Sequence, residues 1–334
     1  NWANRKQHFN SSYDNATVRI SARKHWEKTR DLPYYSGHFR WTGFDYHGES
    51  GLAHGGWPFI LFMGGTLDVA GFKKDLFYFY QSQYTEDPML HILPSWTHPR
   101  MARGTEIPVW VYSNLDEVEL LLNGRSLGRN KPGKIAEEMQ AEWRVPWEPG
   151  QLTAISFQSG KEVLRKTLGT AEAPTQLEHR LDTITTGAAE DTVYVVSSQS
   201  ADRNGEFYPY ASNKVFYQVS DGLRIMSLEN GSPVDHTNRT SSDYRAMFMG
   251  KTRAFIEPRR NGRPRVVTIG SIMGDESLHL SDRVSIDVQR FDMGASAASD
   301  GGFEIYYSVN EPISAQSRAV YAGPIRVQEG DTVY

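Results

Sequence analysis

Residues 38–49 bring aromatic, histidine and carboxylate side chains together in one short run. Trp41 offers a flat face that can pack on the apolar side of a ring, and Asp45, His47 and Glu49 can exchange hydrogen bonds with hydroxyl groups. These residue types suit a pocket that binds a small polar ring such as a sugar. Other interpretations stay open, because Trp41 can fill a core, Asp45 can cap the loop that follows, and Glu49 can lie on the surface.

A metal site is the second chemistry that this run allows. Asp45, His47, Glu49 and His54 are all potential ligands. They lie on a glycine-rich loop, however, and lack the i, i+4 spacing that places two histidines on one helix face. The chain has no cysteine, which excludes thiol catalysis, disulfides and cysteine-ligated zinc. We therefore predict no metal and no other cofactor.

The chain of 334 residues is long enough for about two to four domains. Its formal net charge of -4 favours neither nucleic acid nor an anionic membrane surface as a partner. No apolar run approaches the ~20 residues of a membrane-spanning helix. Half of the 40 aromatic residues lie within the first 98 positions, which fits either a large aromatic core or a sugar pocket. Because the chain opens on Asn1, we interpret its start as mature, cleaved or truncated.

The pattern of the sequence changes after about residue 103. Before it, helical spacing predicts helices over residues 16–28 and 73–83. After it, short alternating runs are separated by turn signals, and Asn123-Gly124 between two apolar runs predicts a β-hairpin. A polar segment at 170–176 precedes a second series of short runs. Two β-sandwiches are therefore expected.

Three segments, in this order and spacing, produce a family resemblance. Residues 38–49 resemble the last barrel strand of family 2 glycoside hydrolases of the bacterial β-galactosidase type, where a Trp-Thr-Gly-Phe-Asp-Tyr-x-Gly-Glu run is typical. Residues 67–96 look like the final barrel helix and exit strand, and residues 111–128 are similar to the β-sandwich that follows the barrel. The resemblance covers about residues 1–290. Residues 303–327 resemble instead the small β module at the carboxy end of some chitobiases and hexosaminidases.

The resemblance implies a multidomain fold. Residues 1–98 would be the carboxy-terminal part of a (β/α)8 barrel. Immunoglobulin-like β-sandwiches would follow over 99–180 and 181–294. A linker at 295–302 would lead to the start of a chitobiase-like β module over 302–334.

The catalytic pair is expected outside this chain. Retaining glycosidases use two carboxylic acids about 5 Å apart, one as nucleophile and one as acid/base. In the family that this chain resembles, both are glutamates on barrel strands before the one that starts near residue 38. Glu27 is the only glutamate ahead of that strand, and it lies in a charged segment typical of a solvated helix. We therefore assign no catalytic residue here and expect the pair in an upstream segment that completes the barrel.

What the chain would supply is one wall of the sugar pocket. The ends of barrel strands face the active site. The resemblance therefore implies substrate contacts from Trp41, Asp45, His47, Glu49 and Asp68. The intact enzyme would release non-reducing β-linked galactose from an oligo- or polysaccharide with retention of configuration.

Two alternatives stay open. β-Glucuronidases of the same family carry Asn-x-Lys to grip the sugar carboxylate, where this chain has Asp68-Val69-Ala70, but Lys73 and Lys74 lie close by in sequence. The second alternative is a non-catalytic carbohydrate-binding or scaffold fragment, favoured by the terminal module and the missing glutamates. Carbohydrate is the expected partner in every case, and a homo-oligomer is left open. A periplasmic or secreted location in a bacterium is expected.

Overall fold

The computed structural model describes residues 22–49, 56–185, 192–220, 222–259, 266–271, 285–290, 306–307 and 319–320. The chain divides into two compact units, Asn1–Arg290 and Phe291–Tyr334. The predicted site residues all lie in the first unit. No helix within the described ranges is long and apolar enough to cross a membrane.

Among the described residues, two helices and a short strand pair precede the first sandwich. They are α1 (Ala22–Asp31), β1 (Tyr46–His47), β2 (Leu61–Phe62) and α3 (Asp75–Tyr84). The helix α3 confirms the one expected over 73–83, and α1 forms the later part of the one expected over 16–28, whose first residues lie outside the described ranges. Leu76 and Phe79 of α3 are three positions apart and both buried, which is the apolar stripe behind that prediction.

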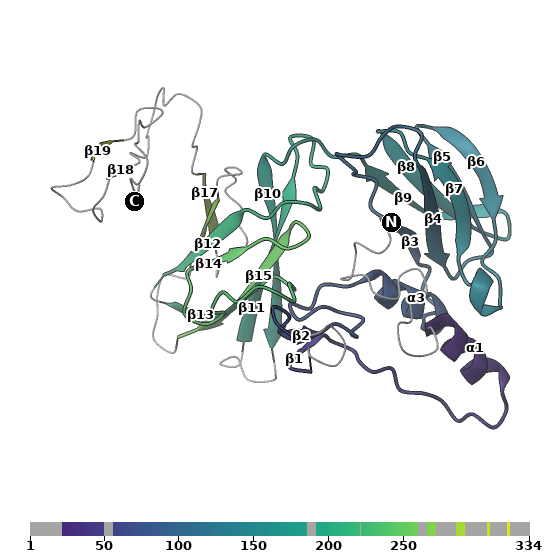
Figure 1. Cartoon of the computed structure of the whole chain (residues 1–334), viewed down its shortest axis with the longest axis horizontal. Helices are drawn as coiled ribbons and strands as arrows, with labels where there is room; N and C mark the ends of the chain where they lie inside the picture. The colour runs from purple at the N-terminus through teal and green to yellow at the C-terminus, as the bar shows by residue number, and fades with distance from the viewer. Residues whose placement is uncertain are drawn as a thin grey trace. The chain divides into compact units, whose positions relative to one another are not determined.

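The first sandwich packs a three-stranded sheet, β3-β4-β7, against a four-stranded sheet, β6-β5-β8-β9 (Figure 1). Its strands are β3 (Leu90–Leu93), β4 (Glu106–Ser113), β5 (Glu117–Leu122), β6 (Arg125–Asn130), β7 (Ala141–Pro146), β8 (Gln151–Gln158) and β9 (Lys161–Gly169). Alternate residues point inward, such as Val109 and Val111 of β4 and Val118 and Leu120 of β5, and they share one apolar core. Period-two alternation in the sequence is therefore what builds this domain.

The strand β3 belongs to this sandwich. Leu90 pairs with Ser113, Leu93 pairs with Trp110, and Ile92 joins the core between the sheets. The sequence had suggested an exit strand of the barrel here and a boundary at residue 99. The sheet instead begins at Leu90, because burying Ile92 against the sandwich removes its apolar surface from water.

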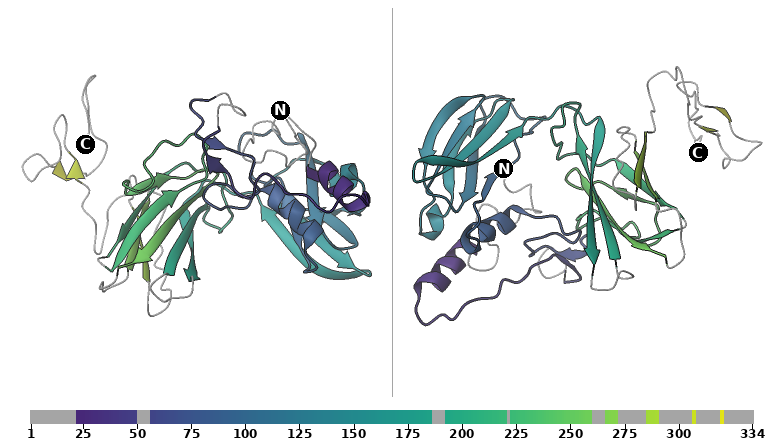
Figure 2. Two further views of the ribbon diagram at one scale, coloured as in Figure 1. Left: turned by 90° about the horizontal axis from the view of Figure 1, so that it is seen from below. Right: turned by 180° about the vertical axis from the view of Figure 1, so that it is seen from behind.

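The helices cover the outer face of the β3-β4-β7 sheet. Trp110 and Tyr112 alternate with the inward residues of β4 and pack with Leu76 and Phe79 in a second apolar cluster. Both views in Figure 2 show α1, in purple, and α3, in blue, beside this sandwich. A short helix, η3 (Ala136–Glu138), meets α1 where Ala136 N donates a hydrogen bond to Glu27. This packing anchors α1 on the first sandwich. The segment with the predicted site residues, 38–49, follows α1 in the chain.

Asn123 and Gly124 form the predicted hairpin turn. The strands β5 and β6 pair antiparallel with Leu122 opposite Arg125. The two turn residues have φ of 51° and 79°, as a two-residue type I′ turn requires. The hairpin prediction is confirmed.

The second sandwich also has two sheets, ordered β10-β11-β15-β13 and β14-β12-β16-β17. Its strands are β10 (Gln176–Thr185), β11 (Thr192–Ala201), β12 (Lys214–Val219), β13 (Leu223–Glu229), β14 (Tyr244–Ala246), β15 (Lys251–Pro258), β16 (Val266–Ser271) and β17 (Ser285–Arg290). All neighbours pair antiparallel except β16 and β17, which are parallel. One core between the sheets includes Val196, Val215, Leu228 and Ile256.

Histidine 179, on β10, is expected to make this sandwich sensitive to acid. His179 Nδ1 lies 2.8 Å from Ser198 Oγ, and burial lowers the pKa of the ring from 6.5 to about 4. A pKa depressed in the folded state stabilises the fold above pH 6.5, and that contribution is lost as the pH falls toward 4. Acidification from pH 8 to pH 5 should cost about 2 kcal/mol from this residue.

Urea unfolding at pH 8 and pH 5 measures this effect. The two proteins compared are the wild type and His179→Gln, so that contributions from other groups cancel. The quantity compared is the change in the free energy of unfolding between pH 8 and pH 5. The variant should show a smaller loss at pH 5, because a glutamine cannot take up the proton. Equal changes would exclude His179 as a source of the acid sensitivity.

In the second unit, the structure describes β18 (Tyr306–Tyr307) and β19 (Ala319–Val320), which pair antiparallel. The remainder of the module expected over 302–334 and the linker expected over 295–302 lie outside the described residues.

Candidate functional site

Residues 42–45 run alongside residues 64–67. Asp45 N donates to Leu67 O over 2.9 Å, and Leu67 N donates to Gly43 O over 2.9 Å. A Cβ at Gly65 would lie 2.3 Å from the Asp45 nitrogen, closer than two such atoms can pack. Only glycine therefore allows the two segments to approach this closely. The pairing fixes the backbone that carries Trp41 at one end and β1 at the other.

Asp45 holds this pairing from inside. Its Oδ1 accepts hydrogen bonds from Lys74 Nζ at 2.7 Å and from Gly65 N at 2.8 Å. The side chains of Lys74 and Asp45 are only 1% and 2% exposed. Burial lowers the pKa of Lys74, and the charge of Asp45 opposes that shift. A sugar contact from Asp45 stays a prediction, whereas its ion pair with Lys74 is observed.

Trp41 and Glu49 are linked through Tyr46. Trp41 Nε1 donates to the Tyr46 hydroxyl over 3.2 Å, and that hydroxyl donates to the Glu49 carboxylate. The Trp41 and Tyr46 ring centroids are 6.3 Å apart at 84°. Trp41 nevertheless exposes 70% of its surface, and its peptide bond to Thr42 is cis. The structure thus joins two of the predicted residues and holds the indole by its edge.

His47 lies on β1, where it pairs with Leu61 of β2, and it is exposed. Loss of water around the ring lowers the pKa of His47, and the positive charges of Arg239 and Arg245 lower it further. The ring is therefore neutral at pH 7, with one nitrogen that donates and one that accepts. Such a ring can serve two sugar hydroxyls.

Asp68 is buried at the contact between the first part of the chain and the second sandwich. It accepts a hydrogen bond from Phe72 N over 2.9 Å, and a Cβ at Gly231 would lie 2.2 Å from its Oδ2. Its charge raises the pKa of Lys251 and of Arg253, against the larger lowering by burial. The observed surroundings of Asp68 are structural, and a sugar contact from it stays a prediction.

Glu27 lies on the helix α1, as expected, but its side chain is only 13% exposed and is not solvated. Its carboxylate pairs with Lys24 and accepts a hydrogen bond from Ala136 N over 3.0 Å. The hydrogen bond from Lys24, and then that from Ala136, lower the pKa of Glu27. These contacts anchor α1 on the first sandwich and give Glu27 a structural role.

The metal interpretation can be tested only in part, since His54 lies outside the described residues. Asp45 is engaged by Lys74, and Glu49 by Tyr46. Across the described part of the chain, no group of three or more His, Asp or Glu residues is placed to hold a metal ion.

A hollow of about 500 Å³ opens between residues 38–43 and α3. It is lined by His38, Phe39, Arg40, Gly43, Thr66, Phe77, Tyr80, Gln81, Tyr84 and Thr85. None of the five residues predicted to contact sugar is in this lining. The hollow and the linked Trp41, Tyr46 and Glu49 side chains are therefore separate features of the same segment.

The second sandwich adds a loop that the sequence did not reveal. Ile60 N donates to Pro233 O over 2.8 Å, and His236 Nε2 donates to Pro58 O over 2.9 Å. His236 also packs on Trp57, with ring centroids 4.2 Å apart at 35°. No local pattern signals His236, because its partner Pro58 lies 178 positions away in the sequence.

Comparison with known proteins places the chain in a family. Residues 104–164 match the family described as Domain of unknown function (DUF4982). The chain is 52% identical, over its full length, to a putative β-glucuronidase of Formosa agariphila, of which it spans 32%. It is 36% identical over 259 residues to the β-galactosidase BoGH2A of Bacteroides ovatus, covering 76% of this chain and 29% of that relative. The chain belongs to family 2 of the glycoside hydrolases.

A solved structure agrees with this assignment. The crystal structure of a β-glycosidase from Bacteroides vulgatus matches the family 2 chain with a TM-score of 0.71 at 36% identity, covering 78% of this chain and 32% of that one. The chain thus spans about a third of the length of these relatives, in their carboxy-terminal portion. The resemblance seen in the three sequence segments is confirmed at the level of the family. The identity of the sugar is not confirmed, because one relative is named a β-glucuronidase and the other a β-galactosidase.

Proposed function

We propose that the protein to which this chain belongs is a retaining, exo-acting glycosidase that releases non-reducing β-linked galactose from an oligo- or polysaccharide. The observation that carries the proposal is the exposed Trp41 indole, held by its edge through the Tyr46 hydroxyl. Residues 22–84 would then form the end of a (β/α)8 barrel, and the two sandwiches would be immunoglobulin-like. Family 2 membership supports a glycosidase as the reaction class.

In this proposal the chain binds and orients the sugar. The Trp41 face packs on the apolar face of the ring, while His47 exchanges hydrogen bonds with its hydroxyls. Glu49 orients the indole through Tyr46. The two carboxylic acids that act as nucleophile and acid/base come from an upstream segment and react through an oxocarbenium-like transition state.

A β-glucuronidase is the second candidate, and two observations favour it. The relative that is 52% identical is named a putative β-glucuronidase. In addition, the charge of Asp68 is offset by the nearby cations Lys251 and Arg253, which weakens its repulsion of a sugar carboxylate. Against this candidate, Lys74 is buried in its pair with Asp45 and is not free to grip a carboxylate.

The direct test compares kcat/KM of the full-length protein on an aryl β-galactoside and on the matching aryl β-glucuronide. We expect the galactoside to be preferred by at least about 100-fold, since a carboxylate without a paired cation is costly to bind. The opposite preference would establish the second candidate. If the protein hydrolyses neither substrate but is retained on an insoluble polysaccharide, its function is binding and the proposal is refuted. The 334-residue chain alone should be inactive on both.

A further inference from the structure

Trp57 is an aromatic side chain that the proposed function has not used. It exposes 80% of its surface and lies ahead of β2 on the connection that follows His47 and β1. An apolar ring of this size left in water gains nothing for the stability of the fold. Flat, exposed indole faces are well suited to pack on the apolar face of a sugar ring.

His236 of the second sandwich holds this ring in place. The two ring centroids are 4.2 Å apart at 35°, so the imidazole packs against one side of the indole. His236 is itself fixed, since its Nε2 donates to Pro58 O over 2.9 Å. The backbone bond from Ile60 N to Pro233 O ties the same two segments together two residues further along. The second sandwich, which follows much later in the chain, therefore orients the Trp57 side chain.

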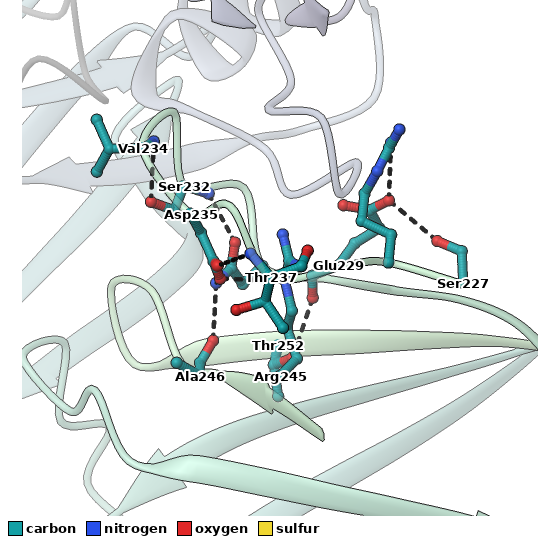
Figure 3. A network of polar contacts seen from close by, with 11 residues as sticks. Ser227, Glu229, Ser232, Val234, Asp235, Thr237, Arg245, Ala246 and Thr252 are labelled. Carbon is teal, nitrogen blue, oxygen red and sulfur yellow. Dashed lines mark hydrogen bonds and ion pairs between the residues drawn. The ribbon is translucent and has the colours of Figure 1, made fainter. Parts of the chain in front are cut away.

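The loop that presents His236 is stiffened by a polar network (Figure 3). Asn230 Nδ2 donates to Asp235 Oδ2 over 2.6 Å and to Ala246 O over 2.8 Å. Arg245 Nε lies 3.2 Å from Asp235 Oδ2, and Arg245 Nη1 donates to Thr237 O over 2.6 Å. Asn230 and Arg245 are both 2% exposed. These buried contacts restrict the loop to one conformation.

The same loop acts on the predicted pocket. Arg239 lies in this loop and Arg245 follows it, and the positive charges of both lower the pKa of His47. Arg239 is in turn paired with Glu229 over 3.1 Å. His47 thus precedes the connection between β1 and β2, and Trp57 lies on that connection, where the loop 229–239 contacts it through His236.

We propose that Trp57, positioned by His236 of the second sandwich, forms the surface on which the sugar next to the cleaved residue stacks. The ligand is a pyranose ring of the leaving chain, recognised by its apolar C–H face rather than by its hydroxyl pattern. This inference rests on the proposed function, because it assumes that Trp41 and His47 hold the neighbouring sugar. It makes the second sandwich a determinant of chain-length preference.

Two substrates of the full-length enzyme separate this site from the rest of the pocket. One is a β-linked trisaccharide with the preferred non-reducing sugar, and the other is the β-glycosyl fluoride of that sugar, whose leaving group has no ring to stack. Trp57→Ala should lower kcat/KM on the trisaccharide by about 10- to 100-fold, because the stacking of one ring and the apolar area that it buries are lost. The same variant should change kcat/KM on the fluoride by less than about twofold.

His236→Ala should reproduce this selective loss at smaller size, mainly as a higher KM. His236→Phe keeps a ring against Trp57 and should restore kcat/KM on the trisaccharide to within about threefold of the wild type. Val234→Ala, at an exposed position 41% accessible on the same loop, serves as the matched control and should leave both substrates unchanged. A purely structural role for His236 would lower activity on both substrates alike.

Equal losses on the two substrates, or none on either, overturn the proposal. If the wild type hydrolyses neither substrate, the proposed function fails, and calorimetric titration with the trisaccharide still tests Trp57. Binding weakened by at least about tenfold in Trp57→Ala would support the stacking site, and unchanged binding would refute it.

Discussion

Replacing Lys74 with methionine should lower the stability of the segment around β1 and β2 by about 3 to 5 kcal/mol. The substitution removes the charged partner at 2.7 Å from the buried Asp45 carboxylate, while Gly65 N still donates to it. Methionine has nearly the same length as lysine, so packing changes little and the loss reports the uncompensated charge.

Hydrogen exchange of the amides in residues 42–45 and 64–67 measures this local stability. A loss of about 3 kcal/mol accelerates exchange by roughly 100-fold or more. Arg165→Met is the matched control, since Arg165 and Glu162 form an exposed pair, 51% and 45% accessible, and its removal should cost no more than about 0.5 kcal/mol.

The double variant Asp45→Asn with Lys74→Met decides the cause. If the cost of Lys74→Met comes from the isolated carboxylate, removing that charge should recover a large part of it. A double variant as unstable as the sum of the single ones would show that the two side chains act independently, and the ion pair would lose its assigned role.

Replacing Trp41 with alanine in the full-length enzyme should lower kcat/KM by at least roughly tenfold, or about 1.4 kcal/mol of transition-state stabilisation. The indole is 70% exposed and is held by its edge through the Tyr46 hydroxyl at 3.2 Å. Its removal therefore takes away ring-stacking area without opening a cavity in the core.

Steady-state kinetics on the β-glycosyl fluoride checks this, because that substrate occupies the pocket for the cleaved sugar alone. Tyr34→Ala serves as control: its side chain is 75% exposed and is not linked to Tyr46, and kcat/KM should stay within about twofold of the wild type. Kinetics unchanged by Trp41→Ala would remove Trp41 from the pocket. Tyr46→Phe should give a smaller loss, since the ring stays and one hydrogen bond to the indole goes.

The sequence was most informative where its signal is local. Asn123-Gly124 predicted its hairpin because the left-handed φ values of a type I′ turn restrict the residue types that can occupy it. Alternation along β4 and β5 predicted a sandwich, because inward and outward positions differ by one residue. The helix α3 followed from the spacing of Leu76 and Phe79.

For the site, the sequence determined the family, and the run at 38–49 supplied the residue types that we predict to contact a sugar. The sequence could not show which of these side chains are buried and paired with other residues of the chain. Asp45 and Asp68 have the same chemistry as Glu49, yet the first two are buried against Lys74 and Phe72 while Glu49 is exposed. Burial depends on what packs from elsewhere in the chain, and no local pattern records it.

The pairing of Trp57 with His236 shows the same division. The sequence established that an indole follows the glycine-rich loop, but only the tertiary structure brought the second sandwich against it. The contact joins residues far apart in the chain, and its geometry depends on the buried network around Asn230 and Arg245. Residue types set what a side chain can bind, and long-range packing sets which partner it meets.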